Sequence, residues 1–192
     1  MRPVQVVWYT AVSIDGRIAG TGDDMAFLDM VDGSGEERDF ADFIAGVEAL
    51  LLGAGTLRWL HGQGHDLPHR GIPIWLLSRD EALAARAASA DPDGTPVTRA
   101  EGEVAAVLDG IATAGHERVW LAGGGDVAGQ VLAADRLDEV ILTVAPTVLG
   151  AGPSAFDHPA LDLRRFQLAE CREYGRGSVR LRWRRDRSGA SA

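Results

Sequence analysis

Apolar residues along the chain recur at two spacings, one typical of β-strands and the other of α-helices. Residues 4–12 are a run of β-branched and aromatic side chains, which predicts a buried strand. Residues 34–47 begin with acidic side chains and continue with apolar ones at helical spacing, which predicts an amphipathic helix. The same criteria predict strands at 4–12, 49–52, 72–77, 118–122, 138–145, 165–174 and 178–185, and helices at 24–30, 34–47, 80–90, 102–114 and 126–134.

The last predicted strand shows a clear alternation. Apolar residues at 179, 181 and 183 alternate with Arg180, Arg182 and Arg184, the period-two pattern of a half-buried strand. We expect the arginine side to face solvent, with a dimer contact or an anion site as alternatives. Because strands alternate with helices before this final strand pair, the fold class is α/β with a mixed sheet.

The chain has 192 residues, which fits one domain, and it shows no internal repeat or linker. We therefore predict a single domain over residues 1–186 and a flexible tail over 187–192. Residues 57–71, rich in Gly, Pro and His, are predicted to be a loop. His61, His65 and His69 within it are spaced by four residues, but the glycines and Pro68 argue against a helix there, so no metal site is predicted.

Composition excludes several classes of function. The net charge of −9 argues against a general binder of nucleic acids or membrane surfaces. No apolar run approaches the roughly 18 residues of a membrane span. The single cysteine, Cys171, excludes an internal disulfide, fits a reducing cytoplasm and is expected to be a small buried side chain in its strand. All 19 basic residues are Arg, which excludes a P-loop lysine and a Schiff-base lysine.

Three glycine-rich turns directly follow predicted strands. They are Ser13–Gly22, Gly53–Thr56 and Gly123–Gly125. In open α/β sheets, ligands bind beyond the carboxyl ends of the strands, where glycine lets a phosphate approach the backbone and a following helix offers free N–H groups. Two such turns before helices suit a dinucleotide. The alternative is that the glycines serve packing alone.

Ser78-Arg79 follows a further predicted strand. The planar guanidinium of Arg binds phosphate in a bidentate manner, so this pair suits a ribose 2′-phosphate. The alternative is an exposed arginine at the start of a helix.

Four motifs occur in the order found in the dihydrofolate-reductase-like superfamily. Residues 13–19 (SIDGRIA) resemble its S-[LVI]-D-G-x-I-A motif, and residues 51–56 (LLGAGT) resemble its second motif. Residues 119–125 (VWLAGGG) resemble its glycine loop. Residues 137–152, with LDEV, Pro146 and LGAG, resemble its D-E-x-x-L…P-x-x-L-G-x-G stretch. The resemblance is closest to the reductase domain of the riboflavin-biosynthesis deaminase–reductase.

This resemblance implies a three-layer αβα fold whose mixed central sheet ends in an antiparallel C-terminal hairpin. It implies a homodimer that transfers hydride directly from NADPH to a pyrimidine or pterin, as in the reduction of 5-amino-6-(5-phosphoribosylamino)uracil. It places Ser13 and Asp15 against the nicotinamide and the substrate. The cofactor-binding residues that it implies are Gly53, Gly55, Thr56, Ser78, Arg79, Gly123, Gly124, Gly125, Asp126 and Val127.

The chain departs from the family pattern at two places that concern ligands. Ala54 stands where dihydrofolate reductases usually have Arg. A preference for NADPH therefore depends on Arg79, and Arg58 is the second candidate. In the family, a D-P-x-L-T-x-R-like run binds a ribose phosphate, and residues 57–71 have only a faint counterpart of it. The resemblance therefore does not decide whether the substrate carries a phosphoribosyl group. The zinc signature of the deaminase half is absent, so we expect a reductase alone.

Hydride transfer also needs a source for any proton that the substrate takes up. The two candidates are Asp15 and Asp24; the alternatives are a turn residue for Asp15 and a helix cap for Asp24. The sequence thus predicts an NADPH-dependent reductase of a small heterocycle. The competing functions are dihydrofolate reduction and a non-catalytic, dinucleotide-binding regulatory protein of the same fold.

Overall fold

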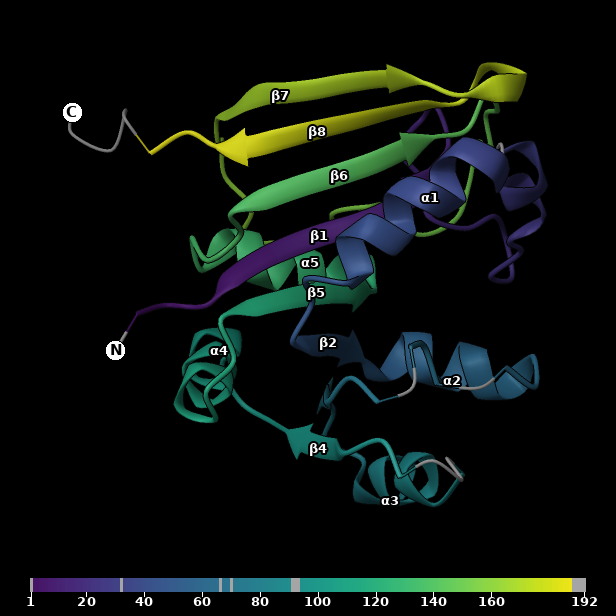
Figure 1. Cartoon of the computed structure of the whole chain (residues 1–192). Helices are drawn as coiled ribbons and strands as arrows, with labels where there is room; N and C mark the ends of the chain where they lie inside the picture. The colour runs from purple at the N-terminus through teal and green to yellow at the C-terminus, as the bar shows by residue number, and fades with distance from the viewer. Residues whose placement is uncertain (1, 32, 66, 70, 91–93, 188–192) are drawn as a thin grey trace.

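The protein is described by a computed structural model that covers residues 2–31, 33–65, 67–69, 71–90 and 94–187. Its centre is an eight-stranded sheet in the order β4-β3-β2-β5-β1-β6-β8-β7 (Figure 1). The strands from β4 to β6 in this order are parallel, and β8 and β7 add an antiparallel pair at one edge. The strands are β1 (Gln5–Val12), β2 (Ala49–Gly53), β3 (Ile74–Leu77), β4 (Val97–Ala100), β5 (Arg118–Gly123), β6 (Glu139–Val144), β7 (Phe166–Glu173) and β8 (Val179–Arg185).

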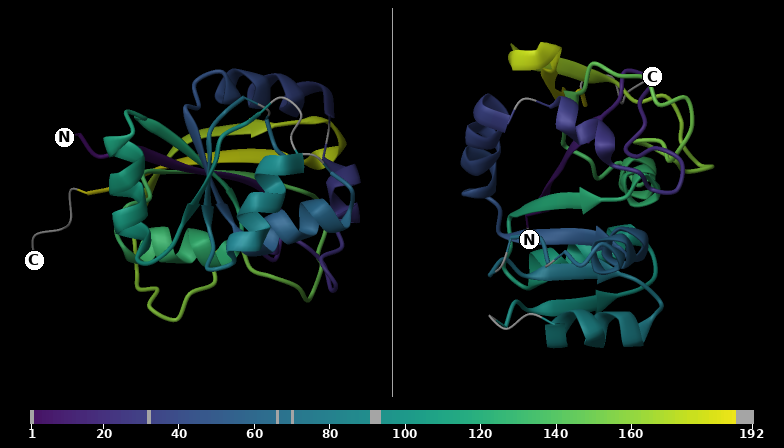
Figure 2. Two further views of the ribbon diagram at one scale, coloured as in Figure 1. Left: turned by 90° about the horizontal axis from the view of Figure 1, so that it is seen from below. Right: turned by 90° about the vertical axis from the view of Figure 1, so that its right-hand side faces the viewer.

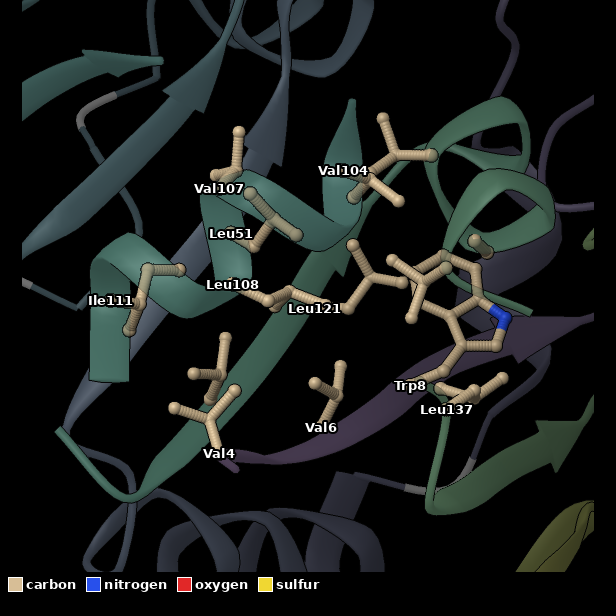
Figure 3. Close-up of a cluster of buried hydrophobic side chains, with 14 of the residues drawn as sticks. Val4, Val6, Trp8, Leu51, Val104, Val107, Leu108, Ile111, Leu121 and Leu137 are labelled. Atoms are coloured by element: carbon tan, nitrogen blue, oxygen red, sulfur yellow. The ribbon is translucent and has the colours of Figure 1, made fainter. Parts of the chain in front are cut away.

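Helices cover both faces of this sheet (Figure 2). One buried cluster joins the sheet to α1, α2 and α3, and a second joins it to α4 and α5. Figure 3 shows the second cluster, in which Leu108 and Ile111 of α4 pack over Leu51 and Leu121 of the sheet. The three-layer αβα arrangement is therefore confirmed. The helices are η1 (Ala26–Met30), α1 (Gly33–Ile44), α2 (Ala54–Gly62), α3 (Glu81–Ala90), α4 (Val104–Thr113), α5 (Gly125–Ala133) and η2 (Gly175–Gly177).

Two elements differ from the sequence-based expectation. The predicted loop 57–71 begins as a helix, because α2 continues to Gly62 and buries Leu57 completely. Strand β4 was not predicted; its two central residues are exposed, so it shows little apolar pattern, but it pairs in parallel with β3. Among the described residues, no group of His, Cys, Asp or Glu side chains is arranged to hold a metal.

The predicted solvent exposure of the arginine side of β8 is correct for Arg184 and wrong for Arg180 and Arg182, which form ion pairs. Arg180 is buried and lies 3.2 Å from Asp39 of α1 and 2.7 Å from Glu170 of β7. Arg182 bonds to the buried Glu139 of β6. The local alternation could not show this, because the carboxylates come from distant parts of the chain.

Cys171 lies in a strand as predicted, but its side chain is exposed and the predicted burial was wrong. The reason is topological: β7 is an edge strand whose residues are mostly exposed. In the predicted tail 187–192, Arg187 lies 2.9 Å from Asp138, and residues 188–192 lie outside the described residues. No helix in the described part of the chain has the length and hydropathy needed to cross a membrane.

Candidate active site

A cleft of about 1240 Å³ lies at the carboxyl ends of β1, β2, β3 and β5, the strand ends at the right of Figure 1. All the cofactor residues implied by the sequence line this cleft. They come from the ends of β2, β3 and β5 and from the first turns of α2 and α5. The structure thus brings these separate glycine turns to one site, although it does not itself test their roles.

The turn from β2 into α2 combines packing with open backbone. A Cβ on Gly53 would lie 2.9 Å from the Cγ2 of Val127, so this glycine permits close packing of α5. A Cβ on Gly55 would meet nothing within 4 Å, so the backbone there is open to the cleft. Gly53 also offers no side chain to cap α2, which leaves N–H groups of the first turn for a ligand.

The turn from β5 into α5 has the same construction. Gly124 stands at the cap position without a side chain, and the Gly123–Gly124 peptide bond is cis. A Cβ on Gly123 would lie 2.5 Å from the Oγ1 of Thr56, so the two turns are in direct contact. Two uncapped helix starts side by side can bind two linked phosphates. Asp126, in the first turn, accepts a bond from Gln130 instead of capping the helix.

Two arginines, Arg58 of α2 and Arg79 just after β3, bring positive charge to the cleft. Arg58 lies 3.2 Å from Asp80, whose pKa is lowered by the N–H of Leu83 and by Arg58. The buried hydroxyl of Ser78 accepts the N–H of Asp80. Arg79 is exposed and has no hydrogen-bond or ion-pair partner among the described residues. Among the described residues of the lining, Arg79 is therefore the cation that is available to a phosphate.

Asp15 lies outside the cleft lining and connects two loops. Its carboxylate accepts bonds from the Ser13 hydroxyl at 2.7 Å and from the N–H groups of Leu149 at 3.0 Å and Gly150 at 2.9 Å. The Ser13 hydroxyl, followed by the Leu149 N–H, lowers the pKa of Asp15 to about 2. An aspartate with this pKa is ionised at neutral pH, so the geometry does not support its predicted role as a proton donor.

Asp24 also lies outside the lining, and its Oδ1 accepts the N–H of Ala26 at 2.9 Å. This is a local turn bond just before η1, whose N-cap position is taken by Met25, so the helix-cap alternative for Asp24 is not met in its strict form. The adjacent Asp23 lines the cleft instead, and its carbonyl oxygen accepts the Trp59 Nε1–H at 3.1 Å. Sequence reasoning missed Asp23, Trp59 and Trp120 as lining residues, because only the fold brings them together.

Two groups with raised pKa values, Tyr9 and Glu36, lie outside the cleft lining. Burial, followed by the charge of Glu36, raises the pKa of Tyr9 to about 12, and burial raises the pKa of Glu36. The two side chains bond to each other at 3.1 Å, and neither lines the cleft. The described lining residues include no His, Tyr or Cys. The proton source therefore stays unassigned.

The role of Asp15 can be tested by the pH dependence of stability. Its folded-state pKa is below the unfolded value of 3.8, so its contribution is complete above that value and is lost as pH falls towards about 2. We expect Asp15→Asn to lower the free energy of unfolding at neutral pH. Denaturant titrations should show the difference from the parent protein shrinking between about pH 4 and pH 2. A difference independent of pH would contradict the assignment.

The comparisons with known proteins agree with this architecture. A family model described as the RibD C-terminal domain matches residues 69–179. The uncharacterized protein YwjB of Bacillus subtilis is 26% identical over 178 residues, which cover 89% of this chain and 92% of YwjB.

Three solved structures show the same fold. A putative riboflavin biosynthesis protein from Shewanella sp. PV-4 has a TM-score of 0.81 at 20% identity, covering 96% of this chain and all of the other. The Thermotoga maritima diaminohydroxyphosphoribosylaminopyrimidine deaminase/5-amino-6-(5-phosphoribosylamino)uracil reductase has a TM-score of 0.72 at 18% identity, covering 96% and 57%. Dihydrofolate reductase from Enterococcus faecalis, in complex with NADP(H), has a TM-score of 0.61 at 15% identity, covering 95% and 96%.

The solved structures are too distant in sequence to show more than the fold. The family model, in contrast, matches more than half of the chain, from the loop before β3 to the start of β8. The chain therefore belongs to the RibD C-terminal domain family.

Proposed function

We propose that this protein is an NADPH-dependent reductase of a small nitrogen heterocycle of the pyrimidine or pterin type. The observation that carries the proposal is the single cleft where two contacting, uncapped helix starts lie beside the unpartnered Arg79. This set of groups matches a dinucleotide with an additional phosphate on its ribose. The reductase and the NADP(H) complex among the similar folds support it.

Each part of the cleft has its own role in this proposal. Gly55 and Thr56, with residues 123–127, bind the pyrophosphate through backbone N–H groups, and Ser78 and Arg79 bind the 2′-phosphate. A reduced nicotinamide would supply the hydride. The protein holds the reactants together and limits the access of water. Asp15 acts through the loops that it connects, and contact of Ser13 or Asp15 with substrate stays a prediction.

Two other functions are compatible with the same fold. A dihydrofolate reductase would oxidise NADPH in the presence of dihydrofolate. A non-catalytic regulatory protein would bind NADPH and turn over no substrate in a panel of heterocycles. The homodimer and the cytoplasmic location likewise stay predictions, the second based on the lone cysteine.

The proposal is tested by binding of NADPH and NADH to the parent protein and to Arg79→Ala. A charge-assisted bond contributes about 1.5–3 kcal/mol, so the variant should bind NADPH roughly 10- to 100-fold more weakly. Its affinity for NADH should change little, because NADH lacks the 2′-phosphate. Quenching of tryptophan fluorescence can report both titrations, since Trp8, Trp59 and Trp120 line the cleft.

Arg86→Ala is the matched control, because Arg86 is an exposed arginine of α3 outside the cleft lining. It should leave both affinities unchanged. Equal losses of NADPH affinity in Arg79→Ala and Arg86→Ala would show a general effect of positive charge and no specific bond to the 2′-phosphate. The absence of binding by the parent protein to either dinucleotide would contradict the proposed function.

A further inference from the structure

Trp8 of β1 is a buried tryptophan whose indole N–H has no acceptor. Its side chain is 1% exposed, and its Nε1 makes no hydrogen bond with the described part of the protein. Buried polar groups in folded proteins nearly always have a partner, and leaving one without a partner costs free energy. The N–H of Trp8 therefore indicates an acceptor that comes from outside the chain.

Trp8 differs in this respect from the other tryptophans of the described cleft lining. The indole N–H of Trp59 donates to the carbonyl oxygen of Asp23 at 3.1 Å. That of Trp120 donates to the carbonyl oxygen of Tyr9, also at 3.1 Å. Among the described buried side-chain atoms that lack a partner, only Nε1 of Trp8 belongs to a residue of the cleft lining. The fold thus satisfies two of these indole donors and leaves the third for the cleft.

The direction of the Trp8 side chain agrees with this assignment. Figure 3 shows the indole nitrogen on the side of the ring that faces away from Val6 and Leu121. Because β1 passes from Val6 through Trp8 towards its carboxyl end, the nitrogen points to the end of the strand that borders the cleft. Ile18, which follows β1 and also lines the cleft, packs against the same buried cluster. The N–H of Trp8 therefore lies at the border between this cluster and the cleft.

The order of the strands relates this N–H to one end of the proposed cofactor. Along the cleft the strands follow one another as β3-β2-β5-β1. Arg79 follows β3, and the uncapped starts of α2 and α5 follow β2 and β5. A dinucleotide whose 2′-phosphate meets Arg79 and whose pyrophosphate meets the two helix starts would extend its nicotinamide towards β1. Trp8 is the lining residue of β1 that offers a free donor there.

We propose that the indole N–H of Trp8 donates a hydrogen bond to the carboxamide oxygen of the nicotinamide and so fixes the orientation of the ring. This inference rests on the proposed function and adds a binding residue to the same cleft. The carboxamide oxygen is a strong acceptor at the edge of an otherwise apolar ring, so one fixed donor decides which face of the ring meets the substrate. Protein atoms cover Nε1, so the bond requires a small shift of a lining side chain. The half-buried Ile18, in the turn after β1, is the candidate for this shift.

The bond can be observed in the parent protein through the indole N–H signals of a proton–nitrogen correlation spectrum. The signal of Trp8 is assigned by its loss in Trp8→Phe. The two ligands are NADPH and ADP-ribose 2′-phosphate, which has the same adenosine and phosphate groups but no nicotinamide. We expect NADPH to move the Trp8 proton signal downfield, as a new hydrogen bond does, and ADP-ribose 2′-phosphate to leave it in place. The signal of Trp120, whose N–H is already bonded to Tyr9, is the internal reference.

Affinities give a second, independent measurement. Trp8→Phe keeps an aromatic ring and removes the donor, so it should bind NADPH roughly fivefold more weakly, which corresponds to about 1 kcal/mol for one neutral hydrogen bond. Its affinity for ADP-ribose 2′-phosphate should stay that of the parent protein. Trp183→Phe is the matched control, because Trp183 is a half-buried tryptophan of β8 outside the described lining of this cleft. It should leave both affinities unchanged.

Several outcomes would overturn the proposal. They are a Trp8 signal that NADPH does not move, a signal that both ligands move equally, and equal losses of both affinities in Trp8→Phe. A Trp8 signal already at a hydrogen-bonded position before any ligand is added would show that water satisfies the N–H, and would overturn it as well. In all these cases ADP-ribose 2′-phosphate still reports on the phosphate-binding residues. If neither ligand binds the parent protein, the proposed function fails together with the role of Trp8.

Discussion

Gly125→Ala is expected to destabilise the protein by about 3 kcal/mol and to abolish most of the dinucleotide binding that we propose. Gly125 begins α5, and a Cβ at this position would lie 1.9 Å from the carbonyl oxygen of Ser154. That atom belongs to backbone, which cannot rotate aside as a flexible side chain would. The segment that contains Ser154 is also held by the bond from the N–H of Ala155 to the carbonyl of Gly16. The added methyl group must therefore displace this wall of the cleft or the start of α5.

Both effects can be measured on the same preparation, with denaturant unfolding for stability and fluorescence titration for NADPH affinity. Gly55→Ala is the informative comparison, because a Cβ there meets nothing within 4 Å and Gly55 lies in a helix. Alanine should maintain or raise stability, by up to about 1 kcal/mol from helix propensity. It should still weaken NADPH binding, since its methyl group faces the cleft. If Gly125→Ala folds and binds as the parent protein does, the close approach to Ser154 is incorrect.

The glycine turns show which part of the site can be predicted from sequence. Parallel strands end at one edge of a sheet, so three strand-ending motifs far apart in the chain had to meet there. The turns after β2 and β5 do line one cleft, whereas the turn after β1 contributes Ile18 and Ala19 but neither Ser13 nor Asp15. The same reasoning could not separate the packing role of Gly53 from the open backbone of Gly55. That distinction depends on Val127, more than seventy residues away.

Asp23 and Asp24 show the limit of local patterns. The two residues are chemically identical neighbours, and spacing gives no reason to prefer either. Only the backbone decides between them: Asp23 adopts a positive φ in the cleft wall, and Asp24 bonds to the N–H of Ala26. In the same way, α2 was missed within a stretch rich in Gly and His because the burial of Leu57, a tertiary effect, outweighs weak helix propensity.

The ion pairs of the β8 arginines, called here the charged layer under α1, join residues that lie still further apart in the sequence. The alternation in β8 predicted the strand, and the strand is present, but the partners of its arginines are supplied by α1, β6 and β7. Glu139, at the start of β6, is only 1% exposed and is the most buried of these carboxylates. It lies at the end of the sheet opposite the cleft, because β6 runs parallel to β1 and begins there. This layer therefore affects stability separately from ligand binding.

Glu139→Gln is accordingly expected to destabilise the protein by about 3 kcal/mol without changing its affinity for NADPH. The Glu139 carboxylate lies 2.5 Å from the Nε of Arg182, 3.3 Å from the Nε of Arg184 and 4.0 Å from the Nη2 of Arg118. Replacing it by an amide keeps the shape but leaves these guanidinium groups facing one another without a counter-charge. Removing one partner of a buried ion pair typically costs about 3–5 kcal/mol. We expect the lower value because Arg184 can turn into solvent.

Denaturant unfolding of three further variants separates the effect of burial from that of charge. Arg184→Gln should cost less than about 1 kcal/mol, since this side chain is 66% exposed and its ion pair is screened by water. Arg182→Gln should cost more, because Arg182 makes both short contacts with Glu139. The double variant Glu139→Gln/Arg182→Gln should be more stable than the sum of the single changes predicts, because the two losses share one interaction. Additive losses of unfolding free energy would show that Glu139 and Arg182 contribute to stability independently. A parallel loss of NADPH affinity would show that this end of the sheet is coupled to the cleft.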